Sequence, residues 1–289
     1  MRCLQYRHRL SLRFKRIICS FFSLAVLAGM IAGYALFVEP QRLTITEYHI
    51  VSEHLPDAFD GKRIVLIADI HHGSRFSRPL LNKIVSQTGE LSPDLILLGG
   101  DYASDQSWAL HACFEKLSEL KAPLGVYAVA GNHDYWDLPL VRKAVGDAGI
   151  ALLENQAIPI EEEGEHILLT GVADYWRGQP SLSGMRQELA ASDFTILLSH
   201  NPDYYDTLSQ EEREQIDLMM SGHTHGGQIT LFGLYAPAKT AAAKYLSGCV
   251  KADNGPTTFI VSNGIGTVGL PVRFFAPPQI VVVTLKKKK

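Results

Sequence analysis

Short apolar runs recur along the chain, and most of them end in a polar or glycine-rich cluster. The runs at 64–68, 95–98, 126–130, 195–198 and 218–220 are built mainly from Val, Ile, Leu, Ala and Met. Uninterrupted apolar runs of this length are typical of strands that are covered on both faces. Between the first strands, segments 79–87, 108–120 and 138–148 place apolar residues at helical spacing. The alternation predicts parallel strands joined by helical crossovers.

The remaining segments are richer in strands than in helices. Residues 43–51 carry β-branched residues and predict a first strand at a sheet edge. Segments 157–160, 166–171, 258–262 and 280–285 predict further strands. Together these elements predict a sandwich of two sheets with helices on the outside.

A long apolar segment precedes this domain. Residues 17–38 contain no charge, and a helix formed by a segment of this length can cross a bilayer. Several basic residues and no acid come before it: Arg2, Arg7, Arg9, Arg13, Lys15 and Arg16. By the positive-inside rule we expect a single-pass anchor with a cytoplasmic N-terminus and an extracytoplasmic domain. The alternatives are a cleaved signal peptide, since Gly33 and Ala35 are small, and a buried core helix.

These features divide the chain into four expected parts: a basic flank at 1–16, a transmembrane anchor at 17–38, one domain at 39–285 and a basic tail at 286–289. We expect the tail to be a disordered run of charge. Much of the positive charge lies at the two ends, so the domain is more acidic than the whole-chain net charge of −3. An acidic surface repels polyanions, so no nucleic acid is expected as a partner.

Cysteine usage excludes a disulfide scaffold. Only Cys113 and Cys249 of the four cysteines lie in the domain. They could form one bond, but two separate buried thiols are the preferred interpretation.

Five polar clusters follow the apolar runs, and these carry the candidate chemistry. They are Asp69-Ile70-His71, Gly99-Gly100-Asp101, Gly131-Asn132-His133-Asp134, Ser199-His200-Asn201-Pro202 and Gly222-His223-Thr224-His225. Ligands collect outside the carboxyl ends of strands in open α/β sheets, so we expect these clusters to converge. Mixed imidazole, amide and carboxylate ligands suit Mn, Fe or Zn better than Mg or Ca.

The ordered set of clusters across residues 69–228 resembles the calcineurin-like metallophosphoesterases. Segments 262–266 and 269–274 are similar to the bacterial membrane-anchored branch of that superfamily. The resemblance implies a four-layer α/β sandwich of two mixed β-sheets flanked by helices, here preceded by one N-terminal transmembrane helix.

The same resemblance implies a site for two divalent metal ions, with Mn favoured over Fe and Zn. One ion would be held by Asp69, His71 and His225, and the other by Asn132, His200 and His223, with Asp101 bridging both. His133 would be the catalytic residue that is not a ligand, stabilising the transition state or protonating the leaving oxygen.

One departure concerns the partner of this histidine. Many relatives carry an acid three residues after the bridging aspartate, whereas this chain has Ser104 there and Asp105 one residue later. Either Asp105 substitutes for that acid, or His133 lacks a carboxylate partner.

Other residues near the clusters receive structural interpretations. His72 is expected at a pocket edge or in solvent, Asp134 as a hydrogen-bonding loop residue, and Asp174 in a turn. Gln228 is an open candidate for positioning phosphate. The aromatic pairs Tyr175-Trp176 and Tyr204-Tyr205, and the segment Arg273-Phe274-Phe275, could line a groove, but core packing is the preferred interpretation.

The expected activity is hydrolysis of phosphodiester, pyrophosphate or monoester bonds by a hydroxide that two metal ions activate. An anchor would hold the site near an envelope-, lipid- or wall-linked substrate. One alternative is a UDP-2,3-diacylglucosamine pyrophosphatase of lipid A synthesis, which requires a cytoplasmic domain. Another is a non-catalytic interaction module on the same fold.

Overall fold

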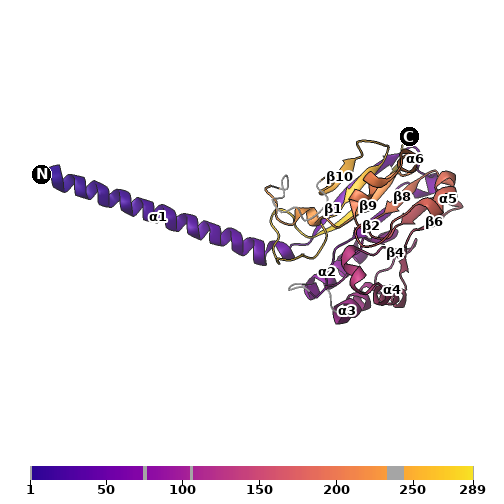
Figure 1. The fold of residues 1–289 in the computed structure, drawn as a ribbon, viewed down its shortest axis with the longest axis horizontal. Helices are drawn as coiled ribbons and strands as arrows, with labels where there is room; N and C mark the ends of the chain where they lie inside the picture. The colour runs from indigo at the N-terminus through magenta and orange to yellow at the C-terminus, as the bar shows by residue number, and fades with distance from the viewer. Residues whose placement is uncertain (1, 74–76, 105–106, 233–243, 289) are drawn as a thin grey trace.

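The computed structural model describes residues 2–73, 77–104, 107–232 and 244–288. A single long helix, α1 (Arg2–Phe37), projects from a sandwich that contains the other elements (Figure 1). The segment Phe14–Gln41 is long and apolar enough to cross a membrane by length and composition, and little of it is buried against the protein.

Two mixed sheets form the sandwich. The first has the order β1 (Thr44–Ser52), β12 (Gln279–Lys287), β2 (Arg63–Ile67), β3 (Leu95–Leu98), β4 (Val126–Ala128) and β5 (Ala151–Leu152). The second has the order β10 (Gly248–Lys251), β11 (Thr258–Val261), β9 (Leu218–Ser221), β8 (Thr195–Leu198), β7 (Glu165–Gly171) and β6 (Gln156–Glu162). In each sheet the consecutive central strands β2–β4 and β7–β9 are parallel.

Alternation along the central strands produces the layers. Val65 and Ile67 of β2 pack towards the helices, whereas Ile64 and Leu66 pack between the two sheets. Helices α2 (Ser77–Glu90), α3 (Ser107–Leu117) and α4 (Leu138–Asp147) cover the outer face of the first sheet. The second sheet is covered more thinly, chiefly by α5 (Arg186–Ala191) and the 3₁₀ helices η4 (Ser183–Met185) and η5 (Pro202–Thr207).

The predicted architecture is confirmed, with helices on both outer faces and β1 at a sheet edge. The short strands β5 and β10 and the short helices α5 and α6 (Gln210–Glu214) were not predicted. The expected disorder of the basic tail is wrong for residues 286–288, because Lys286 and Lys287 pair with β1 as part of β12. Cys113 and Cys249 are free thiols, but only Cys113 is buried, which corrects the expectation for Cys249.

The C-terminal end of α1 is hydrogen-bonded to the domain and not only linked to it through the chain. The backbone N–H of Arg273 donates to the carbonyl of Ala35 at 3.0 Å. The N–H of Ala276 donates at 2.7 Å to the carboxylate of Glu39, a buried residue of the 3₁₀ helix η1 (Glu39–Gln41). The segment around residue 273 therefore holds the end of α1 against the sandwich.

Candidate metal centre

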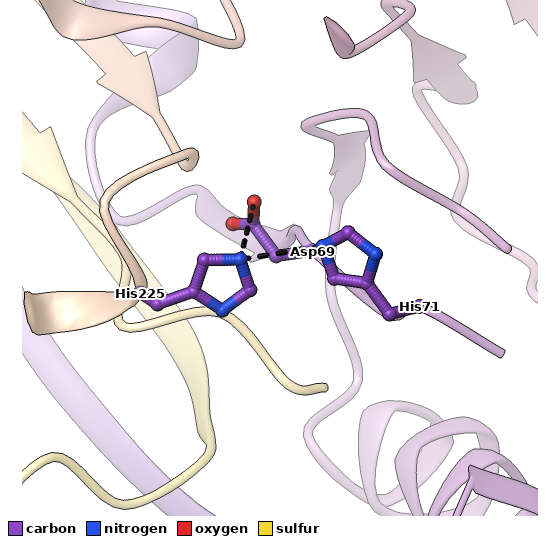
Figure 2. Close-up of side chains that lie close together, drawn as sticks. All are labelled: Asp69, His71 and His225. Atoms are coloured by element: carbon purple, nitrogen blue, oxygen red, sulfur yellow. Dashed lines mark hydrogen bonds and ion pairs between the residues drawn. The ribbon is translucent and has the colours of Figure 1, made fainter. Parts of the chain in front are cut away.

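The first group of converging candidate ligands comes from two strand ends. Asp69 and His71 follow β2, and His225 opens the 3₁₀ helix η6 (His225–Gly227) after β9. Nε2 of His225 lies 3.3 Å from Nε2 of His71 and 3.7 Å from a carboxylate oxygen of Asp69 (Figure 2). All three side chains are buried, and their ligand atoms lie within 4.8 Å of one another.

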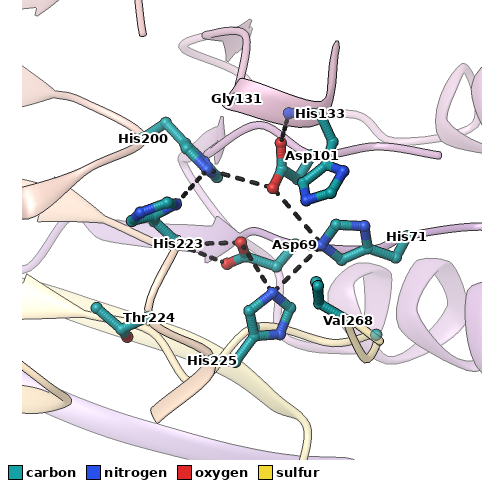
Figure 3. Close-up of polar contacts among 12 residues, drawn as sticks. Asp69, His71, Asp101, Gly131, His133, His200, His223, Thr224, His225 and Val268 are labelled. Carbon is teal, nitrogen blue, oxygen red and sulfur yellow. Dashed lines mark hydrogen bonds and ion pairs between the residues drawn. The ribbon is translucent and has the colours of Figure 1, made fainter. Parts of the chain in front are cut away.

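The second group lies beside the first (Figure 3). His200, after β8, is at its centre: its Nε2 lies 3.2 Å from Oδ1 of Asn132 and 3.1 Å from Nδ1 of His223. The other ring nitrogen of His200 is 2.7 Å from the carbonyl of Gly99, which fixes the orientation of the imidazole.

Asp101, after β3, lies between the two groups. Its Oδ2 is 3.5 Å from Nε2 of His71 and 3.3 Å from Nε2 of His200. Its other oxygen accepts a hydrogen bond from the backbone N–H of His133 at 2.8 Å. One carboxylate thus faces a member of each group, and the imidazole of His133 lies at the edge, 5.0 Å from the His71 ring.

The backbone at these positions adopts an uncommon conformation. Positive φ angles, which non-glycine residues rarely adopt, occur at 44–70° for Asp69, His71, Asp101, His223 and His225. Such conformations persist only where surrounding structure enforces them, and they cluster at functional sites. These backbone conformations therefore cost stability, and they direct the side chains towards a common point.

Burial and mutual charge shift the pKa values of the cluster. Burial lowers the pKa of His71 to about 4 and that of His223 to about 3, and it lowers the pKa of His225 well below the ordinary value. Burial also opposes protonation of His200, but the carboxylates of Asp101 and Asp69 outweigh it and raise its pKa to about 10. Three of the four imidazoles are therefore neutral at pH 7, the form in which histidine binds metal.

The side-chain nitrogen and oxygen atoms are better placed to bind a divalent cation than to hydrogen-bond to one another. The facing Nε2 atoms of His71 and His225 bring two imidazole nitrogens with suppressed basicity to 3.3 Å. Nδ1 of His223 likewise lies 3.1 Å from Nε2 of His200. Buried ring nitrogens that face one another in this way, beside carboxylates, are typical of a ligand set.

Supporting residues hold the ligand loops in place. The buried carboxylate of Asp134 accepts hydrogen bonds from the backbone N–H groups of Asp101 at 2.7 Å, Tyr102 at 3.0 Å and Gly131 at 2.8 Å. This matches its expected role as a loop hydrogen-bonder. At Gly131 a β-carbon would collide with the carboxylate of Asp101 and the ring of His200, so the loop needs glycine there.

Arg273 is a buried residue beside the candidate centre whose position was not predicted from the sequence. Its guanidinium is fully buried beneath His225, with Nη2 3.4 Å from Nδ1 of that ring. Further donations go to the carbonyls of Asn263, Gly266 and Ala276. The preferred interpretation of this segment as core packing is wrong for Phe275, which is 44% exposed, whereas Arg273 is a buried cation beneath a candidate ligand.

Three further polar residues singled out in the sequence lie near the candidate centre or in its loops. Asp174 accepts the N–H groups of Trp176 and Arg177 and closes a turn, as preferred. Gln228 uses its amide on the backbone of Val268 and Leu270, so its candidacy for positioning phosphate is not supported. His72 is buried and belongs to neither ligand group.

The aromatic candidates separate into core and site. Tyr204 and Tyr205 are buried in the core under the second sheet, as preferred. Trp176 is half exposed, and its ring lies edge-on to that of His223 at 4.3 Å between centroids. The question of Asp105 as a partner of His133 lies outside the described residues.

Comparison with known proteins agrees with this geometry. The family described as calcineurin-like phosphoesterase matches residues 62–227. The metallophosphoesterase YkuE of Bacillus subtilis is 33% identical over 270 residues, covering 91% of this chain and 92% of its own. A transmembrane protein with a metallophosphoesterase domain from Danio rerio is 30% identical over 274 residues, covering 91% of this chain and 62% of its own.

Solved structures share the fold at low sequence identity. The sulfate thiohydrolase SoxB of Thermus thermophilus is similar with a TM-score of 0.50 at 12% identity, covering 80% of this chain and 57% of its own. The chain spans about 60% of the length of several curated relatives that it matches. The family match extends over more than half of this chain and includes every converging cluster, so the chain belongs to the calcineurin-like phosphoesterase family and is a metallophosphoesterase.

Proposed function

We propose that the chain hydrolyses phosphoester bonds with two divalent ions held in adjoining sites. Asp69, His71 and His225 would hold one ion. The other would be held by Asn132, His200 and His223. Asp101 would bind both, and the observation that carries this is the position of its Oδ2, 3.5 Å from His71 and 3.3 Å from His200. Mn is the favoured metal, ahead of Fe and Zn.

When bound, the metal pair supplies a nucleophile at neutral pH and neutralises charge on the phosphoryl group. The chain's own contribution is positional. The backbone N–H of His133 is tied to Asp101, which holds the imidazole beside His71, at the edge of the candidate centre. From there it can donate a proton to the leaving oxygen or stabilise developing charge.

We also propose that α1 is a membrane anchor and that the domain begins near residue 39. The uncharged segment and the basic residues before it support a cytoplasmic N-terminus and an extracytoplasmic domain. An anchor of this kind restricts the centre to substrates near the membrane, which favours an envelope-, lipid- or wall-linked phosphoester.

The central experiment uses the full chain in detergent, loaded with Mn²⁺, with bis-p-nitrophenyl phosphate as the chromogenic substrate. We expect about two bound ions per chain by elemental analysis. Asp101→Ala and His223→Ala should abolish hydrolysis, whereas His49→Ala, an exposed histidine on β1, should not. Activity at the parent level in either site variant would overturn the proposed centre. Parent protein that binds no metal and hydrolyses nothing would favour a non-catalytic module.

Orientation is tested separately with a reporter enzyme fused after residue 289, active on only one side of the membrane. We expect activity on the extracytoplasmic side. Activity confined to the cytoplasm would reverse the proposed orientation and favour cleavage of a nucleotide-linked diphosphate lipid.

A further inference from the structure

Four large apolar side chains stand on the surface close to the end of α1. They are Leu231, Phe232, Leu270 and Phe275, exposed by 57%, 69%, 67% and 44%, and are called the apolar rim below. The rings of Phe232 and Phe275 contact each other at 5.0 Å between centroids. The segments that carry them are joined by a hydrogen bond from the N–H of Thr230 to the carbonyl of Phe274.

The backbone of the rim is held in a conformation that does not serve burial. Phe232 has φ 55° and Phe275 has φ 54°, a region that bulky residues avoid. A strained backbone usually marks a functional requirement. Here the strain accompanies exposure of two phenyl rings, so neither packing in the core nor a tight glycine turn accounts for it.

The rim lies where the candidate membrane span meets the domain. Arg273 and Ala276, which lie on either side of the rim residue Phe275 in the chain, hydrogen-bond to Ala35 of α1 and to Glu39 shortly after it. In Figure 1 the end of α1 meets the domain among the orange and yellow loops. Near the end of α1, Nη1 of Arg42 lies 3.5 Å from the hydroxyl of Tyr34, and tyrosine is enriched at membrane–water interfaces.

The rim is also close to the candidate metal centre. Arg273 lies two residues before Phe275 and donates to the carbonyl of His225 at 3.4 Å. Gln228 joins the loop after His225 to the carbonyl of Leu270 at 3.1 Å. A contact made by the rim therefore acts within a few residues of a metal ligand.

We propose that the apolar rim inserts into the bilayer that α1 crosses and holds the metal centre at the level of the lipid headgroups. This inference rests on the proposed role of α1 as an anchor. The continuity between rim and anchor selects the bilayer as the occupant, because tethering by α1 keeps this surface beside lipid. A lipid surface requires no shape complementarity, so apolar side chains that protrude separately can insert into it. The substrate class that follows is a phosphoester on a membrane lipid.

The test places a nitroxide label at single cysteines in the full chain, reconstituted in nanodiscs of phosphatidylglycerol and phosphatidylethanolamine. Cys3, Cys19 and Cys249 are replaced by serine, and the buried Cys113 is kept. Labels go to Phe232→Cys in the rim, to Leu27→Cys in α1 and to Val51→Cys as control. Val51 lies on the edge strand β1 and is 60% exposed, which matches the exposure of Phe232.

Accessibility of each label to oxygen, which dissolves in lipid, and to a water-soluble nickel chelate is read by electron paramagnetic resonance. We expect lipid accessibility at positions 27 and 232 and water accessibility at position 51. A water-exposed label at 232 with a lipid-exposed label at 27 would overturn the proposed insertion of the rim and would leave the proposed role of α1 as an anchor intact. A water-exposed label at 27 would instead refute the anchor. A label at 232 that neither reagent reaches would show that a protein surface covers the rim, which also overturns the proposal.

A kinetic test addresses the substrate class. Phe232→Ser should lower kcat/KM for a nitrophenyl phosphodiester linked to a diacylated lipid in nanodiscs by about tenfold, the effect of removing one buried phenyl ring. Hydrolysis of soluble bis-p-nitrophenyl phosphate by the same preparation reports the state of the metal centre. Equal losses on both substrates, or no loss on the lipid, would contradict a role in lipid presentation.

Discussion

Nη2 of Arg273 lies 3.4 Å from Nδ1 of His225, which places a buried guanidinium directly beneath a candidate metal ligand. Arginine only donates hydrogen bonds, and a metal at Nε2 requires the imidazole proton on Nδ1, so this contact is electrostatic when metal is bound. Nη1 of Arg273 also donates to the backbone carbonyl of His225 at 3.4 Å. The positive charge adds to burial in lowering the pKa of His225. Arg273 therefore helps to keep this imidazole neutral, as metal binding requires, and holds the backbone of His225 in place.

Arg273→Lys should weaken metal binding by about tenfold, because lysine keeps the charge but cannot reproduce the planar fork of donors. Arg273→Met should in addition lower the free energy of unfolding by at least about 3 kcal/mol, since buried carbonyls lose their partners. Titration calorimetry with Mn²⁺ and denaturant unfolding measure the two effects. Arg142→Lys, whose guanidinium pairs with Glu154 on the surface, is the control and should change neither. Parent metal affinity in Arg273→Lys would show that Arg273 is only structural.

Gly131→Ala should reduce phosphodiester hydrolysis by about a hundredfold with the fold retained, because the new methyl group displaces Asp101 and His200. Gly146 of α4 provides a matched control, since a β-carbon there meets nothing within 4 Å. Gly146→Ala should leave activity unchanged and raise the free energy of unfolding by up to about 1 kcal/mol. Steady-state kinetics and thermal unfolding distinguish the two substitutions. Unchanged kinetics in Gly131→Ala would mean that the loop can move without disturbing the centre.

Metal-free protein should lose stability as pH rises from 7 towards 10. The pKa of His200 is raised to about 10 by Asp101 and Asp69 against the opposing effect of burial, compared with an ordinary value of about 6.5. A group whose pKa is raised on folding stabilises fully below its unfolded pKa, and that contribution disappears as pH passes its folded pKa. Melting temperatures of chelator-treated protein across this range measure the effect. A His200→Gln variant should lack the slope, and a slope that persists in it would assign the effect to another group.

The same pKa shift predicts that metal binding releases a proton at pH 7 to 8. His200 must be neutral to bind metal, so metal affinity should rise with pH in this window. Calorimetric heats of Mn²⁺ binding measured in buffers of different ionisation enthalpy give the number of protons released. Heats that do not depend on the buffer would show that His200 is already neutral before metal binds.

Trp176→Ala should lower kcat/KM for an aryl phosphodiester by about tenfold with little change in stability, because the half-exposed ring lies edge-on to His223 beside the centre. Trp108→Ala is a control of similar exposure, 54% against 50%, on α3. Comparing aryl with alkyl diesters shows whether the indole contacts the substrate. An equal loss on both classes would indicate that Trp176 positions His223 instead.

The layers and the ligand clusters could be predicted because both depend on local pattern. Buried parallel strands appear as continuous apolar runs, and the carboxyl ends of neighbouring strands must meet. This logic brought Asp101 and His200 together from positions far apart in the chain. It could not supply the positive φ angles of Asp69 or His71, since these residue types do not signal that conformation as glycine does.

Most of the structural features that the sequence pattern did not predict depend on long-range packing of loops. Arg273 reaches His225, which lies 48 positions earlier in the sequence, and nothing local marks an arginine followed by two phenylalanines as a buried cation. The two-residue strand β5 and the exposed strand β10 lack an apolar pattern long enough to recognise. Lys286 and Lys287 looked like solvated charge, yet the register with β1 extends β12 through them.

The position of β12 between β1 and β2 has a consequence for how the protein is made. β1 hydrogen-bonds to no other strand than β12 within the described parts of the chain, and β12 comes after every other described strand in the sequence. Until β12 pairs with it, β1 therefore has no strand partner, and it links α1 to the sandwich without belonging to a sheet. Pairing with β12 makes this link rigid, so the first sheet takes its position relative to α1 only after β12 has been made.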